Sequence, residues 1–216
     1  MRHTRGSARG LAVAAGAALG AGALALTALA GSATAGESAG ESTARDADTF
    51  VTGDELPTHP DGWYSDGPFD GLPEVPVFCF GSLLPDENAG HVNHRTELDT
   101  NATQVVMDLG NEEDAAGLVE VLHEAGTDCA SDWLWQNPGG TASWDELGEL
   151  EQADYGRVFG VYTAPEQAGQ DVNLFAVVRE GSLVTVVRWG QMGTLDQAPV
   201  EEFLATAESA RARLDG

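Results

Sequence analysis

The chain has 216 residues, 42% of them hydrophobic, with 35 acidic residues, ten arginines and no lysine, for a formal net charge of −25. This length accommodates one domain or two very small ones, and the hydrophobic fraction suffices for a packed core, which excludes a chain disordered throughout. Because so negative a surface repels phosphate backbones and anionic headgroups, nucleic acids and membrane surfaces are not expected as partners.

The first 35 residues have the pattern of a signal peptide. Arg2, Arg5 and Arg9 precede an uncharged run from Leu11 to Ala30, and the small-residue pattern Ala33-Thr34-Ala35 follows. This arrangement is typical of an exported protein that is cleaved after the last alanine. Retention of the run as a transmembrane anchor is the alternative. With cleavage, we expect a secreted, extracellular protein that keeps no membrane anchor.

Residues 36–74 have the composition of a flexible acidic spacer followed by a turn-rich lead-in. Up to residue 58 they contain almost no large apolar side chain, so they bury too little surface to offset the entropy of ordering. The Asp-Gly pairs that begin at Asp61, Asp66 and Asp70 then predict turns. The carboxylates here do not have the spacing of a calcium-binding loop. We therefore expect the folded domain over residues 75–216.

A strand and a helix open this domain. Residues 103–109 have the composition of a strand, and Asn111 follows as a helix N-cap with three acidic residues in the first turn. Apolar residues then recur at helical spacing, and Gly126 is placed where a helix would end. Two further strands are predicted at residues 143–150 and 157–163.

The clearest local pattern is a hairpin. Residues 172–178 and 183–189 are two largely apolar runs on either side of Glu180-Gly181, which we interpret as a two-residue turn that pairs Val178 with Leu183. Because both faces of the two strands are apolar, they are expected at the centre of the sheet. A final helix is predicted from about residue 199 to Leu214.

Cys79 and Cys129 are the only cysteines. In an exported protein two cysteines of one domain are expected to pair, and a loop of this length would add roughly 4 kcal/mol of stability by chain-entropy scaling. A catalytic thiol is the alternative, but it would need an oriented base, and the nearest histidine, His123, shows no sign of one. The complete pattern predicts an α+β fold with an antiparallel sheet of about four to five strands, two main helices and one disulfide.

From about Val75 to Leu214 the chain resembles a family of actinobacterial extracellular domains, which includes the sensor domains of PknH-type Ser/Thr kinases and related secreted proteins of unknown function. The matching features are the helix segment 118–122 that leads to Cys129 and the strand pair around residues 178–184. The resemblance implies an α+β fold with a cleft that binds a ligand, and no enzymatic activity.

Sequence motifs for chemistry are weak. His91 and His94 are three residues apart, a spacing that places them on opposite faces of a strand, so they are interpreted as solvated side chains and no metal site or cofactor is expected. Ser82 lacks the glycine pattern and the strand-turn-helix context of a nucleophile elbow. Enzymatic activity is uncertain, and its absence is favoured.

Arg188 and three tryptophans form the candidate ligand site. Trp133, Trp135 and Trp144 either fill the core or form an aromatic shelf for a sugar or another flat ligand. Arg188 is placed within a strand, opposite Asn173 on an otherwise apolar face, so it needs a carboxylate, a carbonyl or the solvent of a cleft. In the cleft arrangement, Arg188 and a tryptophan would hold an anionic or sugar-like ligand together.

Three functions are compatible with these patterns. The favoured one is an exported, non-enzymatic ligand-binding or sensor-like domain, whose partner is a small molecule or a ligand derived from the cell wall. A secreted hydrolase would instead require polar groups with shifted pKa values gathered in one pocket. A passive protein-binding or inhibitor domain would present an ordered loop or an apolar patch.

Overall fold

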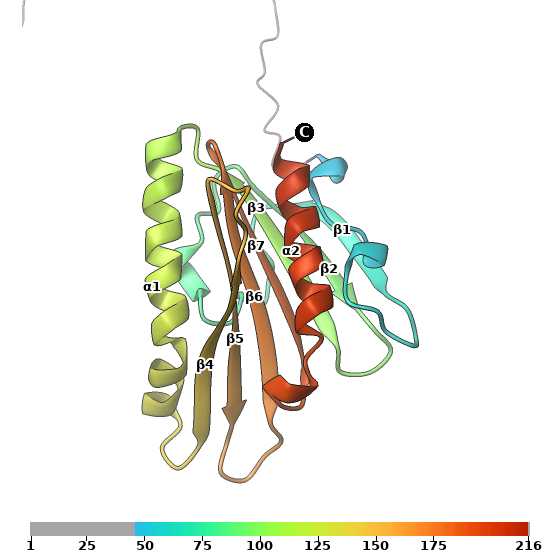
Figure 1. Cartoon of the computed structure of the whole chain (residues 1–216), viewed down its shortest axis with the longest axis vertical. Coiled ribbons are helices and arrows are strands. Elements are labelled where there is room, and N and C mark those ends of the chain that lie inside the picture. Colours follow the sequence, from blue (N-terminus) through green and yellow to red (C-terminus); the bar gives the residue numbers. More distant parts are fainter. Residues whose placement is uncertain (1–45, 216) are drawn as a thin grey trace, which may run out of the picture. The chain divides into compact units, whose positions relative to one another are not determined.

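The computed structural model describes residues 46–215, and within this range seven strands form one antiparallel sheet. They lie in the order β1-β2-β3-β7-β6-β5-β4 across the sheet (Figure 1). The strands are β1 (Tyr64–Asp70), β2 (Ala89–Arg95), β3 (Asn101–Asp108), β4 (Thr141–Glu149), β5 (Tyr155–Ala164), β6 (Asp171–Glu180) and β7 (Leu183–Met192). The helices of the same range are α1 (Glu112–Gln136), α2 (Val200–Leu214) and four short 3-10 turns, η2 (Ala47–Thr49), η3 (Gly53–Glu55), η4 (Gly81–Leu83) and η5 (Leu195–Gln197).

The expectation of four to five strands is wrong, because β1 and β2 do not show a strand pattern in the sequence. β1 contains Gly67 and Pro68, which disfavour strands. All of its residues are exposed, so it has no buried face that would require alternating apolar residues. β2 contains Gly90 and two histidines, yet most of it is buried. Its full-length pairing with β3 makes it a strand, and a pairing partner cannot be read from local composition.

The folded part begins before residue 75, within the segment expected to be a spacer. Phe50 and Val51 are each 2% exposed and Leu56 is 6% exposed, because all three pack into the core. The backbone N–H of Val51 also donates to Oε1 of the buried Gln104 in β3, at 2.7 Å. A few well-placed apolar side chains therefore hold a segment whose average composition is that of a linker. The predicted signal segment, residues 1–35, lies outside the described residues.

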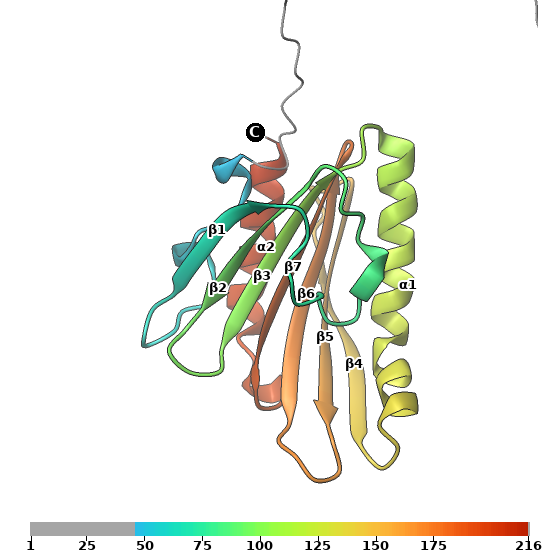
Figure 2. The ribbon, with the colours of Figure 1, turned by 180° about the vertical axis from the view of Figure 1, so that it is seen from behind.

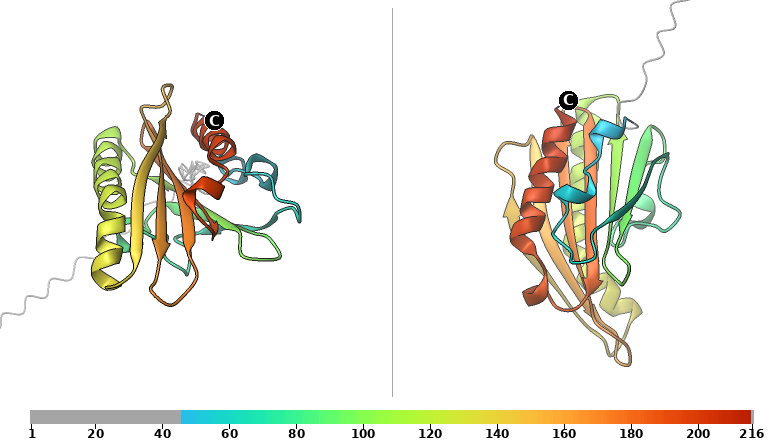
Figure 3. Two further views of the ribbon diagram at one scale, coloured as in Figure 1. Left: turned by 60° about the horizontal axis from the view of Figure 1, so that its bottom comes forward. Right: turned by 90° about the vertical axis from the view of Figure 1, so that its right-hand side faces the viewer.

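The sheet is covered on both faces. On one side, here called the α2 face, α2 and the segment before β1 pack on side chains such as Leu174 and Trp189. On the other side, the α1 face, α1 and the β1–β2 loop (residues 71–88) pack on side chains such as Phe175 and Val186. Figures 2 and 3 show α1 and α2 on opposite sides of the sheet. The two-sided burial of β6 and β7 agrees with the central position predicted for the hairpin.

The hairpin itself has a register that differs by two residues from the predicted one. Glu180 pairs with Leu183, so the turn is Gly181-Ser182, and Gly181 adopts a φ of +56°. A glycine at the first turn position suits this left-handed backbone. Because side chains alternate with a period of two, a shift of two residues leaves each side chain on its predicted face.

The first helix does not end at Gly126 but continues to Gln136. Gly126 is buried, and a Cβ atom there would lie 2.5 Å from Cζ of Phe159 in β5. The glycine thus allows α1 to approach the sheet closely. The sequence pattern alone does not distinguish this role from that of a helix terminator.

Two strands form the edges of the sheet. β1 carries Pro68, which has no backbone N–H to offer another strand. β4 carries exposed acidic residues at Asp145, Glu146 and Glu149. Each edge thus has a feature that disfavours a further strand.

Substitutions at two glycines of α1 compare the close packing of α1 on β5 with intrinsic helix propensity. Gly126→Ala is expected to lower the free energy of unfolding by about 1–3 kcal/mol, because the new methyl group overlaps the Phe159 ring. Gly117→Ala is the matched control: no atom lies within 4 Å of its Cβ position, so the change is expected to raise stability by about 1 kcal/mol. Urea unfolding of both variants measures the difference. Stabilisation by both substitutions would show that α1 does not need the glycine to approach β5.

Candidate functional site

A cleft of about 480 Å³ lies on the α1 face, beyond the edge of the apolar core. The segment Pro73–Phe78 of the β1–β2 loop forms one wall, and residues of β2, β3 and β7 form the other. This segment runs across the sheet on the same side as α1 (Figure 2). The cleft therefore lies between a loop and the polar part of the sheet.

The strand register explains why this part of the sheet is polar. Asn93, Thr103 and Arg188 are direct neighbours across β2, β3 and β7, so their side chains share the α1 face. The Thr103 hydroxyl donates to Oδ1 of Asn93 at 3.0 Å. Arg95 and Asn101 form the next pair along the strands. Because α1 packs mainly on β4 to β7, it leaves these side chains of β2, β3 and β7 to line the cleft.

Arg188 is held by neutral groups. Its Nε donates to Oδ1 of Asn173 at 2.7 Å, Nη2 donates to the same oxygen, and Nη1 donates to Oδ1 of Asn101. Among residues 46–215, no carboxylate forms a salt bridge with it. Burial lowers the pKa of Arg188 to about 10, and the charge of Asp171 opposes this shift. The guanidinium therefore stays positively charged at neutral pH.

Two residues that support Arg188 were missed in the sequence. Asn101, the first residue of β3, is distant from Arg188 along the chain and comes close only through the pairing of β3 with β7. Gly190 lies in β7, where a Cβ atom would be 2.8 Å from Oδ1 of Asn173 and would collide with the guanidinium. A glycine within a strand is a known signal of close approach, so Gly190 could have been singled out.

The three candidate tryptophans do not line the Arg188 cleft. Trp133 borders a separate hollow of about 370 Å³ beside the disulfide. Trp135 is 88% exposed, and Trp144 packs on the core with its ring centroid 6.3 Å from that of Phe159. The aromatic ring that borders both hollows is Phe78. The structure thus places Arg188 at the wall of a cleft, but none of the three candidate tryptophans lines that cleft.

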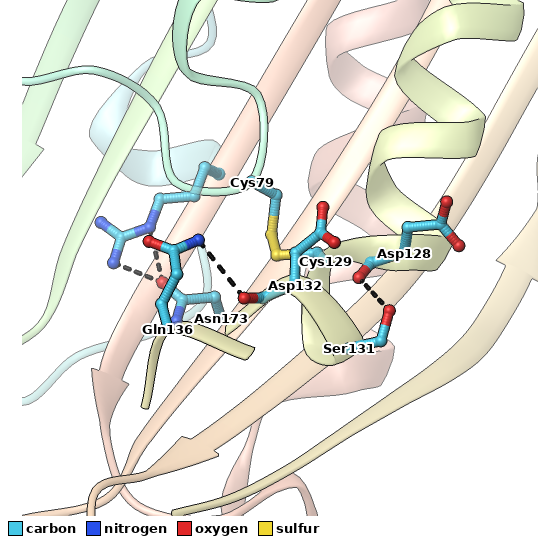
Figure 4. The surroundings of a disulfide bond; sticks show 8 residues. Cys79, Asp128, Cys129, Ser131, Asp132, Gln136 and Asn173 are labelled. Carbon is cyan, nitrogen blue, oxygen red and sulfur yellow. Dashed lines mark hydrogen bonds between the residues drawn. A yellow bond between two sulfur atoms is a disulfide. The ribbon is translucent and has the colours of Figure 1, made fainter. Parts of the chain in front are cut away.

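The predicted disulfide is confirmed: Cys79 in the β1–β2 loop is bonded to Cys129 in α1, with their Cα atoms 5.3 Å apart. Figure 4 shows this bond, with Asn173, the partner of Arg188, among its surroundings. Val77 and Phe80, on either side of Cys79, are 4% and 1% exposed. The wall of the cleft is therefore anchored at its C-terminal end both covalently and by apolar packing.

The two histidines of β2 form hydrogen bonds within the protein. His91 Nδ1 lies 2.8 Å from the carbonyl oxygen of Gly71, and His94 Nδ1 lies 2.8 Å from the Ser65 hydroxyl. Both histidines are buried, so the interpretation as solvated side chains is wrong. Within residues 46–215, no three His, Cys, Asp or Glu side chains are grouped so that they could hold a metal. None of the helices in the same range is long and apolar enough to cross a membrane.

Comparisons with known proteins do not assign the chain to a family. No protein-family model matches it, and no curated protein matches it in sequence. Three solved structures are weakly similar, each with a TM-score of 0.27. The Ran-binding protein Mog1p of Saccharomyces cerevisiae is 16% identical over 61% of this chain and 76% of its own, and a STAR-related lipid transfer protein of Xanthomonas axonopodis is 13% identical over 62% of this chain and 97% of its own. LpqN of Mycobacterium tuberculosis, which is involved in cell envelope biogenesis, is 14% identical over 73% of this chain and 79% of its own. TM-scores this low do not establish a common fold. The resemblance to PknH-type sensor domains receives no support from family models.

The buried His94 is expected to make stability depend on pH. Burial lowers its pKa from 6.5 to about 4. As the pH falls through 6.5, the unfolded chain therefore binds a proton that the folded chain does not accept until about pH 4. The free energy of unfolding should decrease across this window by about 3 kcal/mol, and the full contribution should be present above pH 6.5.

His94→Gln removes this titration. Urea unfolding of the parent and of the variant across the same pH range measures the difference between their slopes. Parallel pH profiles would show that His94 titrates alike in the folded and unfolded chains.

Proposed function

We propose that this chain is an exported, non-enzymatic domain that binds a small anionic molecule, with Arg188 as the principal contact. The observation that carries the proposal is the charged guanidinium at the wall of the cleft, which has only amide oxygens as partners in the described part of the chain. Burial of an unpaired charge is costly, so such an arrangement needs a compensating role.

The hydrogen bonds of Arg188 orient the group without neutralising it. The three hydrogen bonds use three of the five N–H groups of the guanidinium, and two remain without an acceptor among residues 46–215. A carboxylate accepts two N–H groups in parallel and would supply the missing negative charge.

The remaining charge of the protein restricts the ligand. A net charge of −25 repels a polyanion at long range. A ligand with a single carboxylate is repelled far less, and its contact with Arg188 offsets that repulsion. The exposed apolar side chain of Val75 and the ring of Phe78 on the opposite wall suit a ligand that also has an apolar part. We therefore favour a monoanionic small molecule, in keeping with a ligand derived from the cell wall.

Export is supported by two independent features. The N-terminal 35 residues have the pattern of a signal peptide, and the Cys79–Cys129 disulfide suits an oxidising compartment. A sensor-like role outside the cell would follow from ligand binding in that location.

Matched acids and neutral analogues test the proposal. We expect benzoate or galacturonate, but not benzamide or galactose, to shift the side-chain amide NMR signals of Asn101 and Asn173, which hold the guanidinium. Arg188→Gln should weaken binding of the acid by about tenfold or more, because a charge-assisted bidentate contact is lost. Arg157→Gln is the control, since Arg157 already pairs with Glu146 and Glu149. A shift of the Asn101 and Asn173 signals that is equal for an acid and its neutral analogue, or that survives Arg188→Gln, would contradict the proposal.

A further inference from the structure

A third hollow lies on the α2 face, and Trp63 and Trp189 are among the residues that line it. It measures about 300 Å³, at the lower end of the range for small-molecule sites. Its walls come from the segment before β1, from the C-terminal part of β7, and from the residues that lead into α2. Figure 1 shows this segment on the same side of the sheet as α2.

The fold holds both tryptophans in place. Trp189 follows Arg188 in β7, so its side chain points to the opposite face, where it is 2% exposed and forms part of the apolar core. Trp63 is partly buried, and its Nε1 donates to the carbonyl oxygen of Pro57 at 2.9 Å. The ring of His59 stands edge-on to Trp63, with the centroids 6.3 Å apart. The indole of Trp63 is thus fixed, and its ring borders the hollow.

Prolines and polar side chains without a formal charge supply the rest of the lining. Oε1 of Gln197 accepts the backbone N–H of Thr194, which leaves the NH₂ group of Gln197 free to donate. The side-chain amide of Gln191 forms no hydrogen bond with any residue of the range 46–215, so it offers both a donor and an acceptor. In a chain with 35 acidic residues, no Asp, Glu or Arg lines this hollow.

We propose that this hollow binds a neutral sugar ring. Sugar hydroxyls donate and accept hydrogen bonds, as side-chain amides do, and the C–H face of a sugar ring packs on an indole. A neutral lining is not expected to attract an anion. The site is independent of the Arg188 cleft, because residues 188 and 189 point to opposite faces of the sheet.

A proline-rich peptide is the other ligand that aromatic hollows commonly take. Recognition of such a peptide depends in part on donors for its carbonyl groups, as indole N–H groups would provide. Here Nε1 of Trp63 already donates to Pro57, and Nε1 of Trp189 is buried, with no partner in the described residues. Neither indole N–H is therefore at the surface to receive a peptide carbonyl. The geometry therefore favours the sugar.

The five tryptophans of the chain provide the readout, because each indole N–H gives its own NMR signal. On titration of the purified protein with glucose, arabinose or N-acetylglucosamine, we expect at least one sugar to shift the signals of Trp63 and Trp189 and to leave that of Trp135 in place. Trp63→Ala should weaken binding about tenfold through loss of the stacking surface. Trp135→Ala, at a side chain 88% exposed, is the matched control and should bind normally.

A further variant separates recognition from folding. Gln191→Leu keeps both tryptophans and removes the free amide, so it should weaken sugar binding while the unfolding transition is unchanged. Arg188→Gln should leave the sugar response intact, which distinguishes this proposal from the anion site. The proposal is overturned if no sugar moves the two signals, if the shifts persist in Trp63→Ala and Gln191→Leu, or if a polyproline peptide moves them and the sugars do not.

Discussion

The structure depends on the pairing of β6 with β7, two strands whose side chains are buried on both faces of the sheet. Two-sided burial requires a cover on each side, and the chain provides α1 with the β1–β2 loop on one side and α2 with the segment before β1 on the other. The same alternation gives consecutive residues of β7 opposite roles. Arg188 belongs to a cleft on the α1 face, and Trp189 belongs to the core of the α2 face.

The cleft exists because the apolar cover of the α1 face ends before the sheet does. Over β5, β6 and β7 the ring of Phe175 stacks with Phe159 and meets Phe80 edge-on. At the cleft, the β1–β2 loop covers the sheet, and the side chains of β2, β3 and β7 below it include amides, a hydroxyl and the guanidinium groups of Arg95 and Arg188. Gly190 has no side chain, which leaves space for the guanidinium of Arg188. The side-chain amides of Asn101 and Asn173 hold that guanidinium through hydrogen bonds.

The sequence predicted the parts of the fold that are recorded locally. Apolar alternation identified the central strands and their faces, and export with two cysteines identified the bond between Cys79 and Cys129. The turn was misplaced because the chain can reverse at either Glu180-Gly181 or Gly181-Ser182 without a side chain changing face. β2 and the contact between Asn101 and Arg188 depend on pairing between distant segments, which no local pattern records.

For two single residues, the role found in the folded structure differs from the role predicted from the sequence. Gly126 has the properties of a helix end but serves as the contact point between α1 and Phe159. His94 is polar and was expected to face water, yet it is 2% exposed and bonded to Ser65. In both cases the neighbour that decides the role belongs to another element of the fold.

The two outer strands present features that oppose edge-to-edge association between copies of this protein. A sheet grows into fibres when an uncovered strand of one molecule accepts the backbone of the next. Here an approaching backbone would meet a proline on β1, and on β4 it would meet three carboxylates, two of which share the positive charge of Arg157. Two β4 strands in contact would bring two negatively charged edges together. Electrostatic repulsion therefore opposes pairing between copies at this edge of the sheet.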